Sequence, residues 1–353
     1  MSAAAIRSLH PRSVREAEIA GEHVLVRSDL NVPLEEGRIT DDTRIRAALP
    51  TLELLRDRGA ASITVCSHLG RPAGPDSAYS IAPVRARLHE LFDGPLEVLE
   101  NTRFDPREIA NDPTFAEALA DGQDLFVEDA FGSVHRAHAS TVGVAERLPA
   151  YAGLLLEQEL EHLGWLLGEV ARPFVVVCGG AKVDDKLPVI RHLGARADEV
   201  LLGGKLAERL RVSNPLDFPV RLPSDVVGVP RLEPDAESRV CAADELPYGW
   251  SVLDIGPRTA DRFAESIAGA GTIFWNGPMG LFEWPRFADG TDAVARAVAG
   301  SNAFSIVAGA DTLHALNGLG LLDSVSWAST GGGAALELLA GEELPGVAVI
   351  PSA

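Results

Sequence analysis

The chain has 353 residues, of which 46% are hydrophobic, and a formal net charge of −20 at pH 7. Because this length exceeds one ordinary hydrophobic core, we expect two domains of about 150 residues each. The excess of acidic residues argues against nucleic acid as a partner, since proteins that bind nucleic acid present basic surfaces.

The cysteines and the apolar runs indicate the cell compartment. Cys66, Cys178 and Cys241 are few, odd in number and far apart, which suits a reducing environment rather than a disulfide framework or a metal site. The N-terminal residues lack the apolar core of a signal peptide, and no apolar run reaches membrane-spanning length. We therefore expect a cytoplasmic protein with no membrane contact.

The N-terminal half alternates predicted strands with predicted helices. Short apolar runs predict strands at residues 23–27, 62–66, 96–99 and 125–127, and helical patterns cover residues 43–57 and 81–91. Strands that are separated by helices pair in parallel through right-handed crossovers, which predicts a doubly wound sheet. Ligands bind such sheets beyond the carboxyl ends of the strands, so the residues after each strand are candidates for the site.

Basic side chains follow these strands in succession. The segments after the strands read RSDLNVP, SHLGRP, ENTRF and EDAFGSVHR, and they bring to one sheet edge the side chains of Arg27, His68, Arg71, Arg103 and Arg136, with Arg44 at the start of the first helix. Guanidinium groups bind phosphate and carboxylate oxygens through paired hydrogen bonds, which predicts a site for a small, doubly charged anion. We expect Asp29 and Asn31 to orient these cations or to bind substrate hydroxyls, although Asp29 has a structural alternative as a turn acid before Pro33.

Leucines at helical spacing predict a long helix over residues 151–169, which we expect to lead from the first domain to the second. Its apolar stripe is better explained by interdomain packing than by a partner-binding face. Arg172 and Pro173 then mark the entry to the second domain.

A glycine turn opens the second half, in the stretch FVVVCGGAKVDDKL at residues 174–187. Backbone N–H groups between a buried strand and a helix start have no helical partner and favour an anion. Lys182 and Lys186 lie four residues apart and share a helical face. With Lys205 they are the only lysines among 31 basic residues, and a compact point charge kept at glycine turns favours phosphate chemistry. A tight strand-to-helix connection is the structural alternative.

Further glycine turns follow later strands. We predict strands at residues 199–202, 251–255, 272–275, 304–307 and 325–329, a proline-rich loop over 209–231 and a closing helix after Gly333. Glycine lets backbone approach a ligand closely, so a nucleotide is the expected ligand. Neither the G-x-x-x-x-G-K-[ST] nor the G-x-G-x-x-G fingerprint is present.

In their order, these motifs closely resemble the phosphoglycerate kinase family. The matching segments cover nearly the whole chain: VLVRSDLNVPL, DDTRI, SHLGRP, LENTRF, DAFGSVHRAHAS, GGAKVDDK, WNGPMGLFE and STGGGAALELL followed by GEELPGV. The resemblance implies an α/β protein with two Rossmann-like domains that have parallel sheets, face a central cleft, are joined by a long helix and close during turnover. It implies a substrate domain at 1–156, the interdomain helix at 157–171, a nucleotide domain at 172–338 and a tail at 339–353 that returns to the first domain.

The resemblance also implies an activity and its ligands. The reaction is reversible phosphoryl transfer between ATP and the carboxylate of 3-phosphoglycerate, a step of glycolysis that gives 1,3-bisphosphoglycerate and ADP. Mg²⁺ is the implied metal, and the implied protein is a monomer that uses a small anionic substrate and a nucleotide.

Residue by residue, the resemblance assigns three groups of positions in this chain. The substrate-binding residues are Arg27, Asp29, Asn31, Arg44, His68, Arg71, Arg103 and Arg136. The catalytic residues are Arg44, Lys182, Lys186 and Gly332, with Asp311 as the magnesium-linked carboxylate. The nucleotide-binding residues are Gly179, Gly180, Ala181, Lys182, Lys186, Gly203, Gly204, Asn276, Pro278, Glu283, Gly309, Asp311, Thr312, Gly331, Gly332 and Gly333.

Three departures from the family pattern fall on the nucleotide side. Lys205 stands where the family has a third glycine, Ala308 and Ala310 stand in a family Gly-Gly-Gly-Asp-Thr, and the family's helical stretch is largely missing after Leu210. We therefore expect an altered nucleotide preference. Two alternatives remain open: a kinase of another small phosphate- or phosphonate-bearing acid, or a relative that binds the anion without turnover.

Overall fold

The structure is a computed structural model that describes residues 10–353. The chain divides into two compact units. Unit 1 runs to Glu161 and regains the C-terminal segment Glu342–Ala353, and unit 2 is His162–Gly341. Each unit is built on its own five-stranded parallel sheet, so the α/β class with parallel sheets is confirmed.

The sheet of unit 1 has the strand order β5-β4-β1-β6-β7. Its strands are β1 (His23–Ser28), β4 (Ser62–Cys66), β5 (Leu96–Val98), β6 (Leu125–Asp129) and β7 (Ala150–Ala152). The helices of the unit are α2 (Thr43–Asp57), α3 (Ala82–Leu91), α4 (Pro113–Ala120) and α12 (Pro345–Ala348), and a small hairpin joins β2 (Leu34–Glu35) to β3 (Arg38–Ile39). Helix α5 (Leu154–Trp165) contains the boundary between the units.

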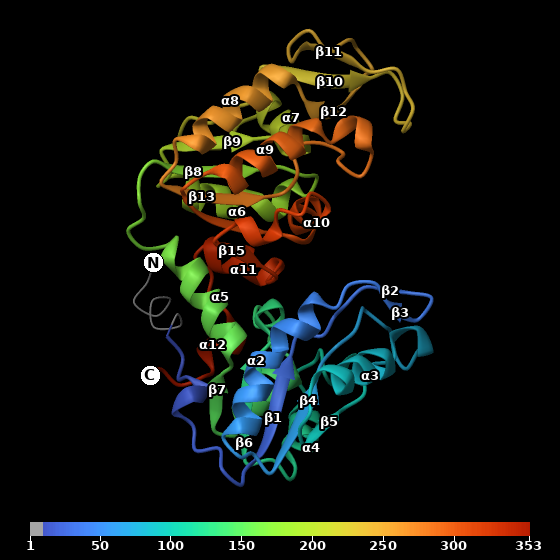
Figure 1. The fold of residues 1–353 in the computed structure, drawn as a ribbon, viewed down its shortest axis with the longest axis vertical. Helices are drawn as coiled ribbons and strands as arrows, with labels where there is room; N and C mark the ends of the chain where they lie inside the picture. The colour runs from blue at the N-terminus through green and yellow to red at the C-terminus, as the bar shows by residue number, and fades with distance from the viewer. Residues whose placement is uncertain (1–9) are drawn as a thin grey trace. The chain divides into compact units, whose positions relative to one another are not determined.

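The sheet of unit 2 has the strand order β15-β14-β13-β8-β9. Its strands are β8 (Phe174–Cys178), β9 (Glu199–Leu202), β13 (Thr272–Asn276), β14 (Phe304–Ala308) and β15 (Trp327–Ser329). Its helices are α6 (Val183–Gly194), α7 (Gly204–Val212), α8 (Pro257–Ala268), α9 (Asp289–Gly300), α10 (Ala310–Gly318) and α11 (Gly333–Leu339). Helices α8 and α9 pack side by side, and a small antiparallel sheet of β10 (Asp225–Val229), β11 (Arg239–Ala242) and β12 (Ser251–Ile255) lies at the periphery of this unit (Figure 1).

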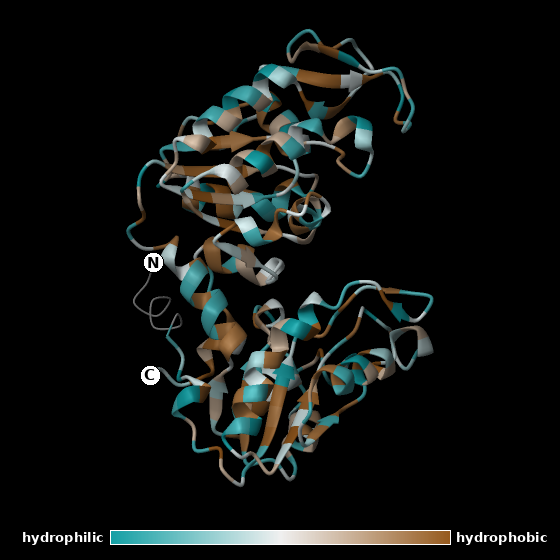
Figure 2. Cartoon of the chain, in the orientation of Figure 1, coloured by the Kyte–Doolittle hydropathy of each residue, from teal (hydrophilic) through white to brown (hydrophobic). Residues whose placement is uncertain are grey.

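Buried aliphatic strands form the core of each unit. Every residue of β8 and β13 is buried, and five of the six residues of β1 are buried. Figure 2 shows these central strands as hydrophobic, whereas the helices around them alternate between hydrophobic and hydrophilic positions. Helix starts follow local signals: Asp112 accepts a hydrogen bond from the Thr114 backbone N–H at 2.8 Å, with Pro113 in the first helical turn of α4.

Two predicted elements differ from the structure. The helix expected over 151–169 is shorter, because Tyr151 belongs to β7 and the chain turns at Gly153, where a side chain would collide with the Asp129 carboxylate. The loop expected over 209–231 is wrong at both ends, since α7 continues to Val212 and β10 occupies Asp225–Val229. The valines of β10 carry a strand signal that the surrounding prolines obscured.

Within residues 10–353, none of the helices combines the length and the apolarity that crossing a membrane demands.

Candidate functional site

Arg27 ends β1 and lies at the centre of a buried network in unit 1. Its guanidinium is only 1% exposed, and each of its nitrogens has a protein partner. Nε donates to Ser140 Oγ at 2.9 Å, Nη1 donates to the Ser28 carbonyl at 2.5 Å, and Nη2 lies 3.3 Å from Ser133 Oγ. Because these donors have protein partners, the geometry favours a supporting role for Arg27, and direct binding of the anion by Arg27 stays a prediction.

His68 receives the remaining contact of Arg27. The Arg27 Nη2 atom lies 2.8 Å from His68 Nδ1, and a guanidinium can only donate, so Nδ1 accepts and the ring proton is on Nε2. Burial lowers the pKa of His68 well below its ordinary value of 6.5, and the positive charges of Arg27, Arg103 and Arg44 lower it further. The imidazole is therefore neutral at pH 7 and can donate from Nε2.

Three further cations lie on the segments that follow β4, β5 and β6. Arg103 donates from Nη1 to the Gly70 carbonyl at 2.5 Å, and its Nε is buried without a hydrogen-bond partner. Arg136 donates from Nε to His135 Nε2 at 3.0 Å. Arg71 is exposed and makes no hydrogen bond or ion pair within the described part of the chain. These guanidiniums keep donors available for a ligand.

The crowded positive charges lower the pKa values of neighbouring basic groups. Burial lowers the pKa of Arg103 to about 10, with Arg27 and Arg136 as further causes. Burial also lowers the pKa of His135 to about 4, and the neighbouring Arg136 acts in the same direction. A bound anion would relieve this repulsion, so the cluster is suited to a ligand with more than one negative charge.

Asp29 and Asn31 orient parts of this cluster. The Asp29 carboxylate forms an ion pair with Arg44, which lies in the first turn of α2. Asn31 Oδ1 accepts from the Gly70 backbone N–H at 2.8 Å and so joins the loop after β1 to the loop after β4. Their observed contacts fit the orienting role that the sequence left open for both.

Two buried residues that the sequence did not single out hold these loops in place. Asn101 Oδ1 accepts from the Leu69 and Arg103 backbone N–H groups, and its Nδ2 donates to the Leu69 and Tyr79 carbonyls. Glu108 is also buried, and it accepts from both the hydroxyl and the backbone N–H of Ser140. Neither residue has a spacing signal in the sequence, because their partners come from distant segments.

In unit 2, Lys186 is held against the backbone at the ends of β8 and β13. Its Nζ donates to the Gly179 carbonyl at 2.6 Å and lies 3.2 Å from the Asn276 carbonyl. Burial lowers the pKa of Lys186. Gly277 has a φ of +95°, and a side chain there would collide with this ammonium group, so the position requires glycine.

Backbone and small side chains build the rest of this edge. Thr312 Oγ1 accepts from the Gly277 N–H at 2.7 Å, and Asn276 Nδ2 donates to the Ala308 carbonyl at 2.8 Å. Asn276 Oδ1 is buried without a hydrogen-bond partner. Helices α10 and α11 begin directly after Gly309 and Gly332, so their N-termini follow β14 and β15 at the carboxyl edge of the parallel sheet.

The other predicted nucleotide-side residues lie on the same set of loops. Lys182, Asp311 and Glu283 are exposed, and Lys182 makes no hydrogen bond or ion pair to another described residue. The turns at Gly179, Gly180, Gly203 and Gly204 are tied together, since the Gly203 N–H donates to the Cys178 carbonyl, the Gly204 N–H to Met279 and the Leu206 N–H to Gly180. Ala181, Pro278 and the residues 331–333 follow β8, β13 and β15.

The residues that depart from the family pattern also have defined positions in the structure. Lys205 lies in the first turn of α7, is 52% exposed and pairs with Glu208 at 2.8 Å. Ala308 ends β14 and is buried, whereas Ala310 is exposed at the start of α10. The Lys205 ammonium is therefore at the surface, already beside a carboxylate.

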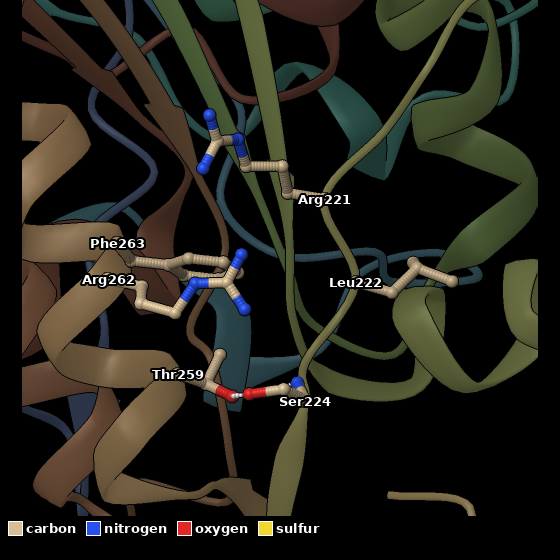
Figure 3. A pocket seen from close by; sticks show the side chains of 6 residues that line it. All are labelled: Arg221, Leu222, Ser224, Thr259, Arg262 and Phe263. Carbon is tan, nitrogen blue, oxygen red and sulfur yellow. Dashed lines mark hydrogen bonds between the residues drawn. The ribbon is translucent and has the colours of Figure 1, made fainter.

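A small cavity elsewhere in unit 2 does not contain any predicted site residue. It lies between the 221–224 segment and α8, and it is lined by Arg221, Leu222, Ser224, Thr259, Arg262 and Phe263 (Figure 3). Thr259 Oγ1 and Ser224 Oγ lie 3.3 Å apart at one side of it, and Arg221 pairs with Glu199 at 3.0 Å. These contacts serve the local fold.

The residues that the structure describes contain no cluster of three or more His, Cys, Asp or Glu side chains that could by itself hold a metal ion.

Comparison with known proteins gives consistent matches. Three overlapping stretches of the chain, residues 14–98, 93–218 and 213–342, match the family described as phosphoglycerate kinase. The phosphoglycerate kinase of Rubrobacter xylanophilus is 49% identical over 385 residues, covering 96% of this chain and 98% of that protein. That of Chloroflexus aurantiacus is 45% identical over 400 residues, covering 98% of this chain and all of the relative. A solved structure of phosphoglycerate kinase from Coxiella burnetii superposes with a TM-score of 0.83 at 35% identity, covering 96% of this chain and 98% of that one.

The lengths of these alignments carry further information. The Rubrobacter alignment spans 385 residues, more than the 353 of this chain, so the relative has segments without a counterpart here. Consecutive matched stretches of the family overlap at residues 93–98 and again at 213–218. The second overlap falls on the segment after Leu210 that the sequence marked as shortened. The first overlap includes β5, where the sequence analysis expected no departure.

Proposed function

Because the chain belongs to the phosphoglycerate kinase family, we propose that the cation cluster of unit 1 binds 3-phosphoglycerate and that the glycine turns of unit 2 bind the nucleotide. The chain catalyses the reaction of that family, ATP-dependent phosphoryl transfer with 3-phosphoglycerate, and is a phosphotransferase with a carboxyl group as acceptor.

One observation carries the substrate assignment. Arg71, Arg103 and Arg136 follow β4, β5 and β6 of the same parallel sheet, and none of them forms an ion pair with another residue in 10–353. A phosphate and a carboxylate on one small molecule supply the two anionic groups that such a cluster lacks. His68 adds a neutral N–H donor, and Arg44, fixed by Asp29, adds another guanidinium. Arg27 supports the cluster through its buried hydrogen bonds, and each of its nitrogens already has a protein partner.

The chemistry of the acceptor determines what the protein must supply. A carboxylate with an ordinary pKa of about 4 is already ionised at neutral pH, so the attack needs no general base. The protein must instead orient the reactants and offset the charge of the migrating phosphoryl group. We assign this role to Lys182, Lys186, Arg44 and the backbone of residues 331–333.

Asp311 fits a role beside magnesium. Mg²⁺ is usually held by one or two carboxylates, nucleotide phosphates and water rather than by a complete cage of protein ligands. A single exposed carboxylate in the first turn of α10, on the same sheet edge as Lys186, meets that requirement. When bound, the ion would offset negative charge on the nucleotide phosphates.

We also infer a monomer in the cytoplasm. Cys66, Cys178 and Cys241 are all free thiols, which suits a reducing compartment, and gel filtration with light scattering tests the oligomeric state.

A coupled assay tests the assignment. Purified protein is supplied with 3-phosphoglycerate or another small phosphorylated carboxylic acid, and with ATP or GTP at several concentrations. Binding of each reactant is measured by calorimetry. Turnover with 3-phosphoglycerate and ATP is the expected result. Turnover only with a different phosphorylated acid, or binding of 3-phosphoglycerate without turnover, would overturn the substrate assignment.

A further inference from the structure

Glu108 is a buried carboxylate outside the set of predicted site residues. It is 0% exposed, and its Oε1 accepts from Ser140 Oγ at 2.6 Å while its Oε2 accepts from the Ser140 backbone N–H at 3.0 Å. The Glu108 carbonyl accepts from the Ala139 N–H at 2.9 Å. Side chain and backbone together fix the start of the short π-helix Ala139–Gly143.

Ser140 connects this carboxylate to the cation cluster. A hydroxyl has one proton and two lone pairs, so Ser140 Oγ donates to Glu108 and accepts from Arg27 Nε at 2.9 Å. Arg27 in turn donates from Nη2 to His68 Nδ1 at 2.8 Å. The series Glu108, Ser140, Arg27 and His68 is buried throughout. Arg27 donates to both of its neighbours, Ser140 and His68, and Ser140 donates to Glu108.

We propose that Glu108 is a positioning residue, which acts through Ser140 and Arg27 to hold the His68 imidazole in the tautomer that offers Nε2–H to the substrate anion. This inference rests on the proposed role of unit 1 as the 3-phosphoglycerate site. It adds a residue that does not touch the substrate but helps to hold Arg27, whose guanidinium determines which nitrogen of His68 carries the proton.

Other carboxylates of unit 1 are engaged elsewhere. Asp29 pairs with Arg44, and the buried Glu128 accepts from the Ala130 N–H at 2.9 Å. Burial lowers the pKa values of Arg103 and His138, and the Glu108 charge opposes that lowering, which partly offsets the repulsion among the cations. Glu108 thus combines a direct hydrogen-bond path to Arg27 with a favourable charge, in a site where charge-assisted hydrogen bonds are strong.

Two variants test the path. Ser140→Ala removes the hydroxyl that joins Glu108 to Arg27, and Glu108→Gln removes the charge and one of the two acceptors. In the wild-type protein without ligands, ¹⁵N NMR of His68 should show the Nε2–H tautomer alone, and both variants should show a measurable Nδ1–H fraction. In steady-state assays, KM for 3-phosphoglycerate should rise about tenfold, while kcat and KM for ATP stay within about twofold.

Asp225→Asn is the matched control. Asp225 of unit 2 is also fully buried, and it also accepts from a hydroxyl at 2.6 Å, that of Thr259. Its replacement should lower thermal stability as much as Glu108→Gln does, without changing the His68 tautomer or KM for 3-phosphoglycerate.

The outcomes separate the inference from the proposed function. A His68 tautomer that is unchanged in Ser140→Ala, or a loss of kcat with KM unchanged, would overturn the positioning role of Glu108. The NMR measurement needs no turnover, so it tests this role even if the wild-type protein fails to use 3-phosphoglycerate. Ser140→Ala keeps the test available if Glu108→Gln fails to fold.

Discussion

The two units build their proposed ligand-binding edges in opposite ways. In unit 1 the edge consists of side-chain cations fixed by buried hydrogen bonds, with Arg27 fully engaged and Arg103 partly so. In unit 2 the edge consists of backbone turns and helix N-termini, with Lys186 as a partly buried cation against two carbonyls. Both arrangements occupy the carboxyl ends of parallel strands, so we propose that the same sheet architecture supports two different kinds of anion site.

The difference follows from what each edge has to recognise. A small dianion has few atoms to contact, so its recognition depends on several positive side chains held close together. These charges repel one another, and this repulsion costs free energy until a ligand anion is bound. A nucleotide offers a long phosphate chain that backbone N–H groups can follow, so little fixed charge is needed. All three departures from the family pattern lie in unit 2, and two of them add a side chain beside a turn, where no charge network is disturbed.

The largest effect is expected for the charge at the transferring group. Lys186→Ala removes the partly buried ammonium at the end of β8 in unit 2. The kcat should fall by about 10²–10³-fold with KM for 3-phosphoglycerate within about threefold, because the charge is needed chiefly in the transition state. Steady-state kinetics in both reactants measure this. Arg209→Ala, which removes an exposed cation of α7, is the control and should change kcat less than twofold. An unchanged kcat in Lys186→Ala would remove it from the catalytic residues.

A smaller effect is expected when a single cation is removed from unit 1. Arg71→Ala should raise KM for 3-phosphoglycerate about 30-fold with kcat within about threefold, since Arg71 has no partner in residues 10–353 and binds ground state and transition state alike. Arg46→Ala, which removes an exposed arginine paired with Asp42, controls for general charge loss. If an uncharged substrate analogue lost as much affinity as 3-phosphoglycerate, Arg71 would not be acting through charge.

The sequence was sufficient to predict most strands of the two parallel sheets. The predicted strands 62–66, 174–178, 199–202 and 251–255 coincide with observed strands, because short apolar runs bounded by turn residues are strong local signals. The same reasoning placed the cations after successive strands of unit 1. It also placed Lys182 and Lys186 in the turn and helix after β8.

What the sequence could not predict depends on distant partners. Arg27 reads as a ligand-binding cation, but its donors are used by Ser28, Ser133, Ser140 and His68, which lie on four different segments. Asn101 and Glu108 were missed for the same reason. The antiparallel β10 and β11 were missed because prolines surround their short valine-containing runs.

The free energy of unfolding, measured as a function of pH, tests the effect of a buried acid in unit 2. Burial raises the pKa of Asp254 in unit 2 to about 7, above its ordinary value of 3.8, so the folded state binds a proton that the unfolded state releases between these values. This group therefore lowers stability as pH rises from about 4 to 7, with a slope of up to about 1.4 kcal/mol per pH unit. Asp254→Asn should flatten that part of the curve, as measured by urea unfolding at several pH values. The exposed Asp261→Asn should leave the slope unchanged, and equal slopes in wild type and Asp254→Asn would contradict the buried-acid explanation.

The smallest effect is expected at the departure that the sequence marked most clearly. Lys205 is exposed and pairs with Glu208 one turn along α7, and an exposed pair of this kind contributes about 0.3–0.5 kcal/mol. Lys205→Ala should therefore change KM for ATP by less than about threefold and leave KM for 3-phosphoglycerate unchanged. The Glu208→Ala variant, which releases the lysine, is the matched comparison. A loss of ATP affinity well above threefold in Lys205→Ala, together with a gain in Glu208→Ala, would show that the lysine leaves its carboxylate to bind nucleotide phosphate. The proposed nucleotide site of unit 2 would then use a lysine side chain as well as backbone N–H groups. In that respect it would resemble the side-chain cation cluster of unit 1.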